Sequence, residues 1–419
     1  MTADPYTSIA HHASRARRRL PETMLPYWHA VSRDDEIGGY LLHDDVKRSP
    51  IRRAGRALLR GRRPHEPDDK QLVSQARLVW VFSHAHRKGF GDGPVYLDAA
   101  TRGHRFLLDH FRDAERDGYR WMTDRYGRPV NDVKLFYGQA FVIYGMVEYA
   151  RAAGRCEPLD DALALFRAVE RELHDDRFGG WREQADGDWS ALADDDPRVE
   201  VPFAGRKSGN AAVHWMEALT ELYADTADAD VRRALVETLD LSRRHLFPAD
   251  PARTREPCLP DWTLDPASEQ LISYGHNVEY VWLMVRAQQA IGVDPDWDRF
   301  HAYVDHTLRF GFDHRHGGVY AWGHRDERAP RRHKVWWVQC ELIAALTDAL
   351  AVRPDERYAR ALAQTLDFVE RHMTDPRDGI LLDAVQEDGR RRWPRKSGNW
   401  KVGYHDVRAA VKLAEGFAP

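Results

Sequence analysis

The chain's strongest pattern is the recurrence of apolar residues with the period of an α-helix. Apolar side chains at positions i, i+3, i+4 and i+7 mark one face of a helix. Several of the segments with this spacing are apolar around much of their circumference, which is typical of helices in the inner layer of a large all-α fold. The segments are 133–152, 210–226, 277–292, 335–350 and 358–373.

Short glycine turns recur between the helical segments. Each turn combines one or two acidic residues with Gly and then an aromatic or aliphatic residue, and the glycines fall at positions 38, 118, 179, 317 and 379. Asp and Gly end helices and open tight turns, because Gly reaches positive φ without steric cost. The gap from 179 to 317 is about twice the others, so we expect a sixth unit around residues 247–262, where prolines interrupt the chain.

The repeat predicts the fold class. Six units of roughly 60–80 residues are each long enough for two helices and a turn. An open array of such units would be a solenoid, whereas six pairs can also close into a two-layer ring. The very apolar helices favour closure, since a closed inner ring is buried on both sides. We therefore predict an all-α protein, an (α/α)6 barrel of six helical hairpins in one domain over residues 1–419, with short β-hairpins on one face.

Composition narrows the classes of protein. Hydrophobic residues make up 43% of the 419 residues, enough for a sizeable core, and a formal net charge of −4 gives no global positive excess for nucleic acid. Cys156, Cys258 and Cys340 lie far apart without CxxC spacing, which argues against disulfides or a zinc–thiolate site. No apolar run approaches the roughly 20 residues of a membrane span. We expect a soluble, cytoplasmic protein without a membrane or nucleic-acid partner.

One local stretch is strongly basic. Residues 47–63 hold eight basic side chains and no acidic one. Such a stretch is commonly a solvated loop or a short exposed helix. An active-site lid, a phosphate-binding patch and an oligomer contact are the functional alternatives, and the sequence leaves the choice open.

The common catalytic motifs are missing from the sequence. It contains no HExxH zinc helix, no GxxxxGK[ST] phosphate loop, no GxSxG elbow and no GxGxxG turn after a strand. The 21 histidines do not cluster at the spacing of metal ligands. We therefore expect neither a metal nor another cofactor.

Histidines at the expected helix starts are the first candidates for chemistry. His276 and Glu279 are three positions apart, so on a helix they share one face and can touch. A carboxylate beside an imidazole raises its basicity and fixes its tautomer for proton transfer. His405 follows the Gly-rich segment 396–404 and can point into the mouth of a barrel. The alternatives are a surface ion pair for His276 and a capping or packing role for His405.

Further polar and aromatic residues are candidates for binding. Asn210 and His214 lie one helical turn apart, where they could converge on sugar hydroxyls or, alternatively, cap and pack the helix. Adjacent Trp336 and Trp337 cannot both face the core of one regular helix, so one is expected to face a cavity, where the C–H face of a sugar could stack on it. Arg77 interrupts an apolar helix and needs either a polar cavity or a structural ion pair.

Seven segments in order resemble the motif series of the N-acylglucosamine 2-epimerase superfamily, above all its cellobiose 2-epimerase and mannose 2-epimerase branches. The resemblance runs from about residue 24 to the C-terminus. Each motif is short, and the specificity comes from seven in the right order at similar spacing. They are ARLVWVFS (76–83), KLFYGQAF (134–141), GGW (179–181), N-x-x-x-H (210–214), YGHNVE (274–279), KVWWVQCE (334–341) and NWKVGYH (399–405).

The resemblance implies an (α/α)6 barrel and metal-independent catalysis. It implies that His276 and His405 are the catalytic histidines and that Glu279 orients the first of them. It also implies that Arg77 anchors the substrate and that His214 lies near the ring oxygen and the anomeric hydroxyl. The remaining pocket members that it implies are Tyr137, Asn210, Trp336, Trp337 and Trp400.

Some residues beside the expected pocket depart from the family pattern. Cellobiose epimerases tend to read WWPQ where this chain has Val338, and GPWK-x-PYH where it has Ser397, Gly398, Asn399 and Gly403. These departures leave the choice between a monosaccharide and a disaccharide substrate open. The expected catalytic histidines are unaffected.

The resemblance implies proton transfer at C2 of a free aldose. Ring opening, assisted by His214, places C2 beside a carbonyl; one histidine then removes the C2 proton, and Arg77 stabilises the resulting cis-enediolate. Return of a proton to the other face of C2 gives the 2-epimer, which the form YGHNVE favours, whereas protonation at C1 gives the ketose, as in a mannose–fructose isomerase.

Two other classes of protein remain as alternatives. A glycoside hydrolase on the same fold needs two opposed carboxylates, for which Asp34, Asp175, Asp313 and Glu279 are candidates. A non-catalytic binding scaffold would not need His405. The expected partner is a small-molecule sugar, and the chain is expected to be a monomer or a homodimer.

Overall fold

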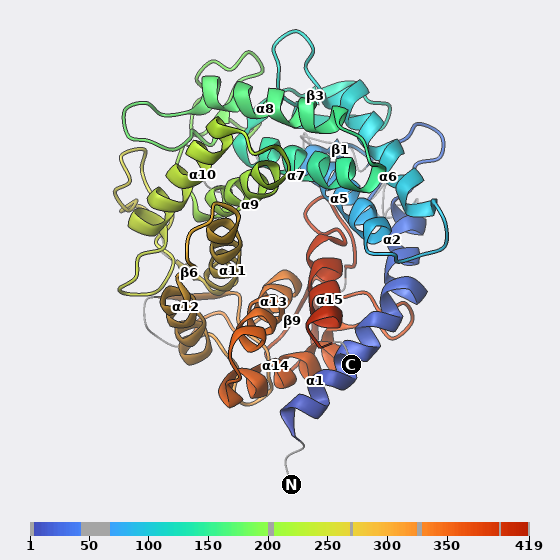
Figure 1. The fold of residues 1–419 in the computed structure, drawn as a ribbon, viewed down its shortest axis with the longest axis vertical. Helices are drawn as coiled ribbons and strands as arrows, with labels where there is room; N and C mark the ends of the chain where they lie inside the picture. Colours follow the sequence, from blue (N-terminus) through green and yellow to red (C-terminus); the bar gives the residue numbers. More distant parts are fainter. Residues whose placement is uncertain are drawn as a thin grey trace, which may run out of the picture.

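The computed structural model describes residues 4–42, 68–199, 205–268, 271–324, 329–393 and 395–417. Helices dominate and form two concentric rings around one axis, and Figure 1 looks along it. The basic segment 47–63 lies outside the described residues.

An inner ring of helices surrounds the axis. Within the described residues each of its six helices contacts the next, and the last contacts the first, so the ring is closed. This arrangement confirms the predicted (α/α)6 barrel. The helices are α5 (Leu72–Arg87), α7 (Phe136–Ala153), α9 (Gly209–Thr226), α11 (Tyr274–Ala290), α13 (Trp336–Val352) and α15 (Tyr404–Gly416).

An outer ring covers the inner one. Its helices are α1 (Pro5–Arg19), α2 (Leu25–Ser32), α6 (Val95–Phe106), α8 (Glu157–Leu173), α10 (Ala229–Leu241), α12 (Trp297–Phe310) and α14 (Glu356–Phe368). Four π-helical turns, η1 (Leu20–Met24), η2 (Leu107–Phe111), η3 (Ser242–Leu246) and η4 (Val369–Met373), extend outer helices. Helix α1 packs against both α14 and α15, so the first helix of the chain closes the outer ring over the last (Figure 1).

The two rings differ in hydrophobic pattern for a physical reason. In α7 every residue from Phe136 to Ala150 is buried, because an inner helix is covered by neighbours on both sides and by the outer ring. In the outer helix α10 the buried residues are Val231, Ala234, Leu235, Thr238 and Leu239, the spacing of a single apolar stripe.

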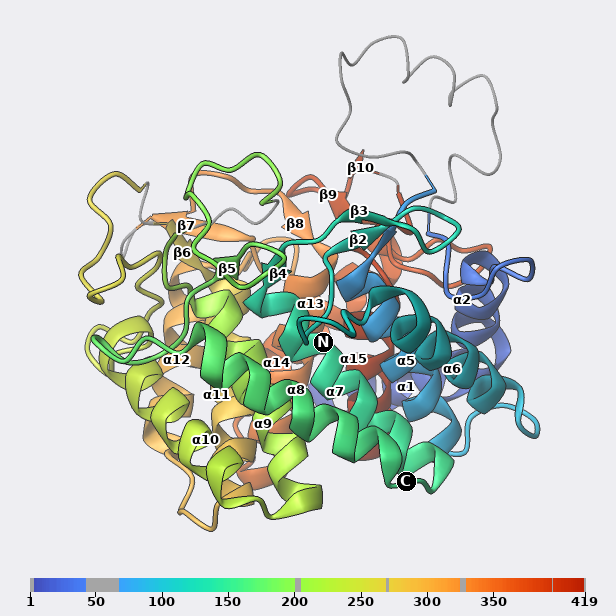
Figure 2. The same ribbon diagram turned by 90° about the horizontal axis from the view of Figure 1, so that it is seen from above.

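Short antiparallel strands gather at one end of the barrel (Figure 2). Four of them lead directly into inner helices: β1 (Lys70–Gln71), β4 (Lys134–Leu135), β6 (Leu271–Ser273) and β8 (Lys334–Val335). The inner helices therefore point their N-termini toward the strand-bearing face. The other strands are β2 (Met122–Thr123), β3 (Pro129–Asn131), β5 (Gln184–Ala185), β7 (Trp322–His324), β9 (Ala384–Val385) and β10 (Arg391–Trp393), and the sheets run β1-β2-β3, β10-β9-β8, β4-β5 and β6-β7.

The glycine turns are fastened to the inner helices by buried ion pairs. In five of the six turns the first Asp binds a lysine that precedes the next inner helix, and the turn glycine has a positive φ. The N–O distances are 3.0 Å for Lys70–Asp34, 2.9 Å for Lys134–Asp113, 2.8 Å for Lys207–Asp175, 2.8 Å for Lys334–Asp313 and 2.9 Å for Lys396–Asp375. The turn before α11 has no such pair, since the chain contains no lysine between Lys207 and Lys334.

Those ion pairs also bear on the hydrolase alternative. Asp34, Asp175 and Asp313, which that alternative needed as opposed acids, each hold a lysine beneath a turn and do not line the central pocket.

In the part of the chain that the structure describes, no helix is both long and apolar enough to span a bilayer.

Candidate active site

A central pocket of about 350 Å³ opens at the N-terminal ends of the inner helices. The structure brings together all ten side chains that the sequence singled out, and it adds Trp322 of β7. The lining consists of Arg77, Tyr137, Asn210, His214, His276, Glu279, Trp322, Trp336, Trp337, Trp400 and His405.

The partner of His276 differs from the expectation. Its Nδ1 lies 2.9 Å from Oε1 of Glu256, which belongs to the loop before α11, whereas Glu279 accepts a hydrogen bond from Nη2 of Arg408 at 2.9 Å. The expectation that Glu279 holds the His276 ring was therefore wrong. Three-residue spacing does place His276 and Glu279 on one face of α11, but Glu279 lies a turn further along the helix, within reach of Arg408.

The other two pocket histidines are held in the same way. His405 Nδ1 lies 2.6 Å from Glu341 Oε1, and His214 Nδ1 lies 3.0 Å from Glu217 Oε2. A neutral imidazole that donates from Nδ1 to a carboxylate keeps its acceptor lone pair on Nε2. In all three histidines Nε2 is therefore the nitrogen that remains for a substrate.

One guanidinium joins the pocket carboxylate Glu279 to two further buried carboxylates, which lie behind the pocket lining and form with it the floor of the site. Arg408 donates through Nη2 to Glu279 at 2.9 Å and to Glu341 at 2.7 Å, and through Nη1 to Glu217. The hydroxyl of Tyr404 also donates to Glu217, at 2.7 Å. Buried acids of like charge are tolerated here because one buried cation and the helix N-termini compensate them.

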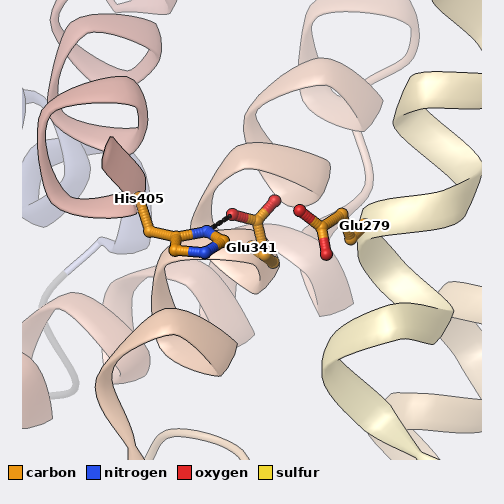
Figure 3. A group of neighbouring side chains, drawn as sticks. All are labelled: Glu279, Glu341 and His405. Atoms are coloured by element: carbon orange, nitrogen blue, oxygen red, sulfur yellow. Dashed lines mark hydrogen bonds and ion pairs between the residues drawn. The ribbon is translucent and has the colours of Figure 1, made fainter. Parts of the chain in front are cut away.

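Glu279, Glu341 and His405 form a compact group (Figure 3). The two carboxyl groups turn toward each other, and potential ligand atoms of all three residues lie within 4.8 Å of one another. That spacing would suit a metal ion, but Arg408 already donates to both carboxylates and supplies a positive charge there.

Burial and local charges give the two central histidines different proton affinities. Burial lowers the pKa of His405 to about 3, and the positive charges of Arg77 and Arg408 add to burial and outweigh Glu341. For His276, burial also acts to lower the pKa, but the negative charges of Glu256, Glu279 and Glu341 outweigh it and raise the pKa above its usual value. His405 is therefore neutral near pH 7, and His276 has the higher proton affinity of the two.

Burial and neighbouring charges also shift the pKa of the other titratable groups at the floor of the site. Burial lowers the pKa of His214 to about 4, against the opposing effect of Glu217. Burial and the charge of Glu341 raise the pKa of Glu279. For Glu341, burial acts to raise the pKa, but Arg408 and His405 outweigh it and hold the pKa well below its usual range.

Arg77 is a buried cation that faces the pocket. Its side chain donates from Nη2 to the Tyr137 hydroxyl at 2.7 Å, and its guanidinium lies over the rings of Phe141, at 4.2 Å, and Tyr404, at 5.0 Å. Among the described residues no carboxylate forms an ion pair with Arg77, so the alternative of a structural ion pair is not observed. Its remaining donors are available to an oxygen of the substrate.

Tryptophans form the walls and the rim. The ring of Trp337 lies 5.2 Å from His276 and 5.8 Å from His405, so it contacts both imidazoles. Gly275 permits this packing, because a β-carbon at that position would overlap the Trp337 ring. Trp400 is 41% exposed and its ring lies 6.2 Å from Tyr137, which places it at the rim.

Several residues of the site were not predicted from the sequence. Glu217 and Arg408 carried a usable signal, since each follows a pocket histidine by three positions, as Glu279 does. Glu341 ends the KVWWVQCE segment, which drew attention only for its tryptophans. Glu256 and Trp322 lie in loop and strand segments, where helical spacing carries no information.

The fold and the site define an (α/α)6-barrel protein with paired histidines and carboxylates in one central pocket. The sequence pattern of the N-acylglucosamine 2-epimerase (GlcNAc 2-epimerase) family matches residues 58–409, and the chain belongs to that family.

Comparison with individual proteins places the similarity along nearly the whole chain. The chain is 28% identical to a cellobiose 2-epimerase of Bacteroides fragilis, over 95% of this chain and 97% of that protein. It is 26% identical to a D-mannose isomerase of Thermobifida fusca, over 72% of this chain and 74% of that one. The solved structure of a cellobiose 2-epimerase from Spirochaeta thermophila superposes with a TM-score of 0.81 at 26% identity, covering 98% of each chain.

Proposed function

We propose that this protein is a sugar 2-epimerase that interconverts free aldoses at C2. The observation that carries the proposal is the pair His276 and His405, which come from α11 and α15 and both contact Trp337 of the intervening helix α13. A sugar stacked on Trp337 would lie within reach of both imidazoles. Membership of the 2-epimerase family and the similarity to cellobiose 2-epimerases support it.

The reaction begins with ring opening. An aldose C2–H is not acidic in the cyclic form, whereas in the open chain C2 is next to a carbonyl group. His214 has a lowered pKa and is therefore neutral near pH 7, so its Nε2 can accept the anomeric hydroxyl proton and return it to the ring oxygen as the C1–O5 bond breaks and the C1 carbonyl forms. Asn210, on the same helix, hydrogen-bonds the sugar hydroxyls.

Proton transfer at C2 then uses the two central histidines. Neutral His405 removes the C2 proton, and the electron pair of the C–H bond moves to form C1=C2 while O1 becomes an oxyanion. His276, which holds a proton, delivers it to the opposite face of C2 and the carbonyl forms again. For the opposite epimer the two histidines exchange roles.

The cis-enediolate is stabilised electrostatically. Arg77 offers buried guanidinium donors that no carboxylate of the described chain neutralises. The six inner helices direct their N-termini at the pocket, each equivalent to roughly half a positive charge. Preorganised donors and dipoles aimed at a developing oxyanion lower the barrier, because they need no reorganisation during the reaction.

An aldose–ketose isomerase, of the mannose–fructose type, is the second candidate. The same base and the same enediolate serve both reactions, and the products differ only in whether the proton returns to C2 or to C1. The similarity to D-mannose isomerases favours keeping this candidate.

With either activity we further propose a small-molecule sugar substrate, a single catalytic domain over residues 1–419, catalysis without metal or other cofactor, and a cytoplasmic location.

Proton NMR in D2O separates the candidates. The purified protein is incubated with mannose, glucose or cellobiose without added metal. Interconversion of mannose and glucose, or of cellobiose and its 2-epimer, with deuterium at C2 is the expected result. Formation of fructose with deuterium at C1 would show that the protein is an aldose–ketose isomerase and not a 2-epimerase. Absence of deuterium exchange with every aldose offered would contradict both proposals.

A further inference from the structure

Among the six connections that lead into inner helices, as far as the structure describes them, the loop before α11 is the one without the lysine–aspartate pair. Instead, the chain after η3 forms an antiparallel bridge in which Lys207 and Cys258 exchange two backbone hydrogen bonds, of 2.8 and 2.9 Å. This bridge lays residues 256–258 against the start of α9. The departure from the repeat therefore brings a loop residue to a helix N-terminus beside the pocket.

Glu256 is the residue that this loop places between the N-terminus of α9 and His276. Its Oε2 accepts a hydrogen bond from the backbone N–H of Gly209 at 2.7 Å, and its Oε1 lies 2.9 Å from Nδ1 of His276. The residue is 3% exposed. One carboxylate thus joins the first residue of α9 to a histidine of α11, and a carboxylate at a helix N-terminus is favoured by the helix dipole.

A second carboxyl group holds the same helix end. Glu183 Oε1 accepts from both the backbone N–H and the hydroxyl of Ser208, each at 2.9 Å, and Ser208 in turn caps α9 by accepting from Ala211 N–H. Burial raises the pKa of Glu183 to about 8, and the negative charge of Glu256 adds to the rise. Glu183 is therefore neutral near pH 7.

We propose that Glu256 is the positioning residue of His276, and that Glu183 fixes the helix end from which Glu256 is held. Glu256 keeps the proton of neutral His276 on Nδ1, so that Nε2 faces the sugar, and it stabilises the imidazolium that carries the proton to C2. The catalytic meaning rests on the proposed epimerase function. The contact itself can be tested without any substrate.

The test compares two amide substitutions in the same loop. Glu256→Gln keeps the size of the side chain and an acceptor for Gly209, but it removes the charge beside His276. Asp261→Asn is the matched control, because Asp261 is exposed and, among the described residues, accepts hydrogen bonds from Thr263 alone. Thermal unfolding verifies that both variants fold.

Nitrogen-15 NMR of the imidazoles, without substrate, gives the direct readout. We expect Glu256→Gln to lower the pKa of His276 and to abolish the predominance of its Nδ1–H tautomer, with Asp261→Asn unchanged. In assays on the sugar that proves active, kcat should fall about 10- to 100-fold with KM nearly constant. Glu183→Gln should retain activity within about threefold, since an amide can still accept from Ser208 and replaces a neutral acid.

The outcomes separate this proposal from the proposed function. An unchanged titration and tautomer of His276 in Glu256→Gln, or an equal change in Asp261→Asn, would overturn the positioning role whatever the activity. A wild-type protein inactive on every aldose, whose His276 still responds to Glu256→Gln, would support the positioning role and overturn the epimerase.

Discussion

Glu341 Oε1 lies 2.6 Å from Nδ1 of His405 and accepts a second hydrogen bond from Arg408 Nη2 at 2.7 Å. The same oxygen therefore orients the imidazole and is itself held by a buried cation. Because Arg408 takes part of the negative charge, Glu341 fixes the ring without making it strongly basic, and burial leaves the pKa of His405 low. Orientation and proton affinity are thus set by different neighbours.

Glu341→Gln should lower kcat about 10- to 100-fold with little change in KM, because the amide can orient His405 in either tautomer. Steady-state kinetics on the active sugar measures the effect. Asp348→Asn on the same helix is the control, since Asp348 pairs with Lys412 and both side chains are partly exposed. Equal losses in the two variants would argue that Glu341 acts through the stability of α13 and not through His405.

Arg408→Met should destabilise the fold by about 3–5 kcal/mol, because three buried glutamates lose their common cation. Lys412→Met, one turn further along α15, removes a lysine whose pair with Asp348 is partly exposed, and it should change stability by no more than about 1 kcal/mol. Urea unfolding provides both values. Similar midpoints for the two variants would mean that the glutamates of the floor become protonated at little cost when Arg408 is absent.

The pH dependence of kcat/KM follows from the two histidines. His405 must be neutral, and its pKa is lowered to about 3, so the acid limb should lie well below the ordinary histidine value of about 6.5. His276 must be protonated, and its pKa is raised, so activity should fall as pH rises through that raised value. Initial rates measured from about pH 4 to about pH 10 test both signs. An acid limb near pH 6.5, about the unperturbed value, would contradict the assigned roles.

The sequence alone indicated those pocket residues whose polar side chains stand at recognisable positions in the predicted helices. His276 and His405 were predictable because each begins an inner helix after a Gly-containing segment, and the barrel followed from the recurrence of glycine turns. Arg77 was visible because a cation in an apolar helix needs a polar environment. Each of these signals is local, so no knowledge of tertiary contacts was required.

Contacts between distant segments were not predictable in this way. Glu256 reaches His276 only because residues 256–258 pair with the start of α9, a contact that no periodicity encodes. The expectation for Glu279 failed for the related reason that helical spacing defines a shared face but not the nearest partner on it. Arg408 lies across the barrel from Glu217, so its role depended on closure of the ring.

Lys134→Met tests the turn-fastening ion pairs. Lys134 is fully buried and lies 2.9 Å from Asp113. Its loss leaves a buried carboxylate whose one remaining cationic partner among the described residues is Arg120, and it should destabilise the fold by about 3 kcal/mol. The double variant Lys134→Met, Asp113→Leu should recover part of the loss, because no buried charge then lacks its partner. Urea unfolding gives the free energy of unfolding of the wild type, the single variant and the double variant. A double variant that recovers none of the loss would contradict the coupling of Lys134 and Asp113.

The two tryptophans Trp337 and Trp400 should have different roles, one in catalysis and one in the binding of a longer substrate. Trp337 contacts both central histidines, so Trp337→Ala should lower kcat for every sugar that is turned over. Trp400 lies at the rim and is 41% exposed, so we expect its ring to stack on a part of the substrate that extends out of the pocket. If the substrate is a disaccharide, Trp400→Ala should raise KM for cellobiose by roughly 2- to 12-fold, equivalent to about 0.5–1.5 kcal/mol of stacking, and leave KM for mannose unchanged. Equal effects on the two sugars would place Trp400 against the reacting ring and would favour a monosaccharide as the natural substrate.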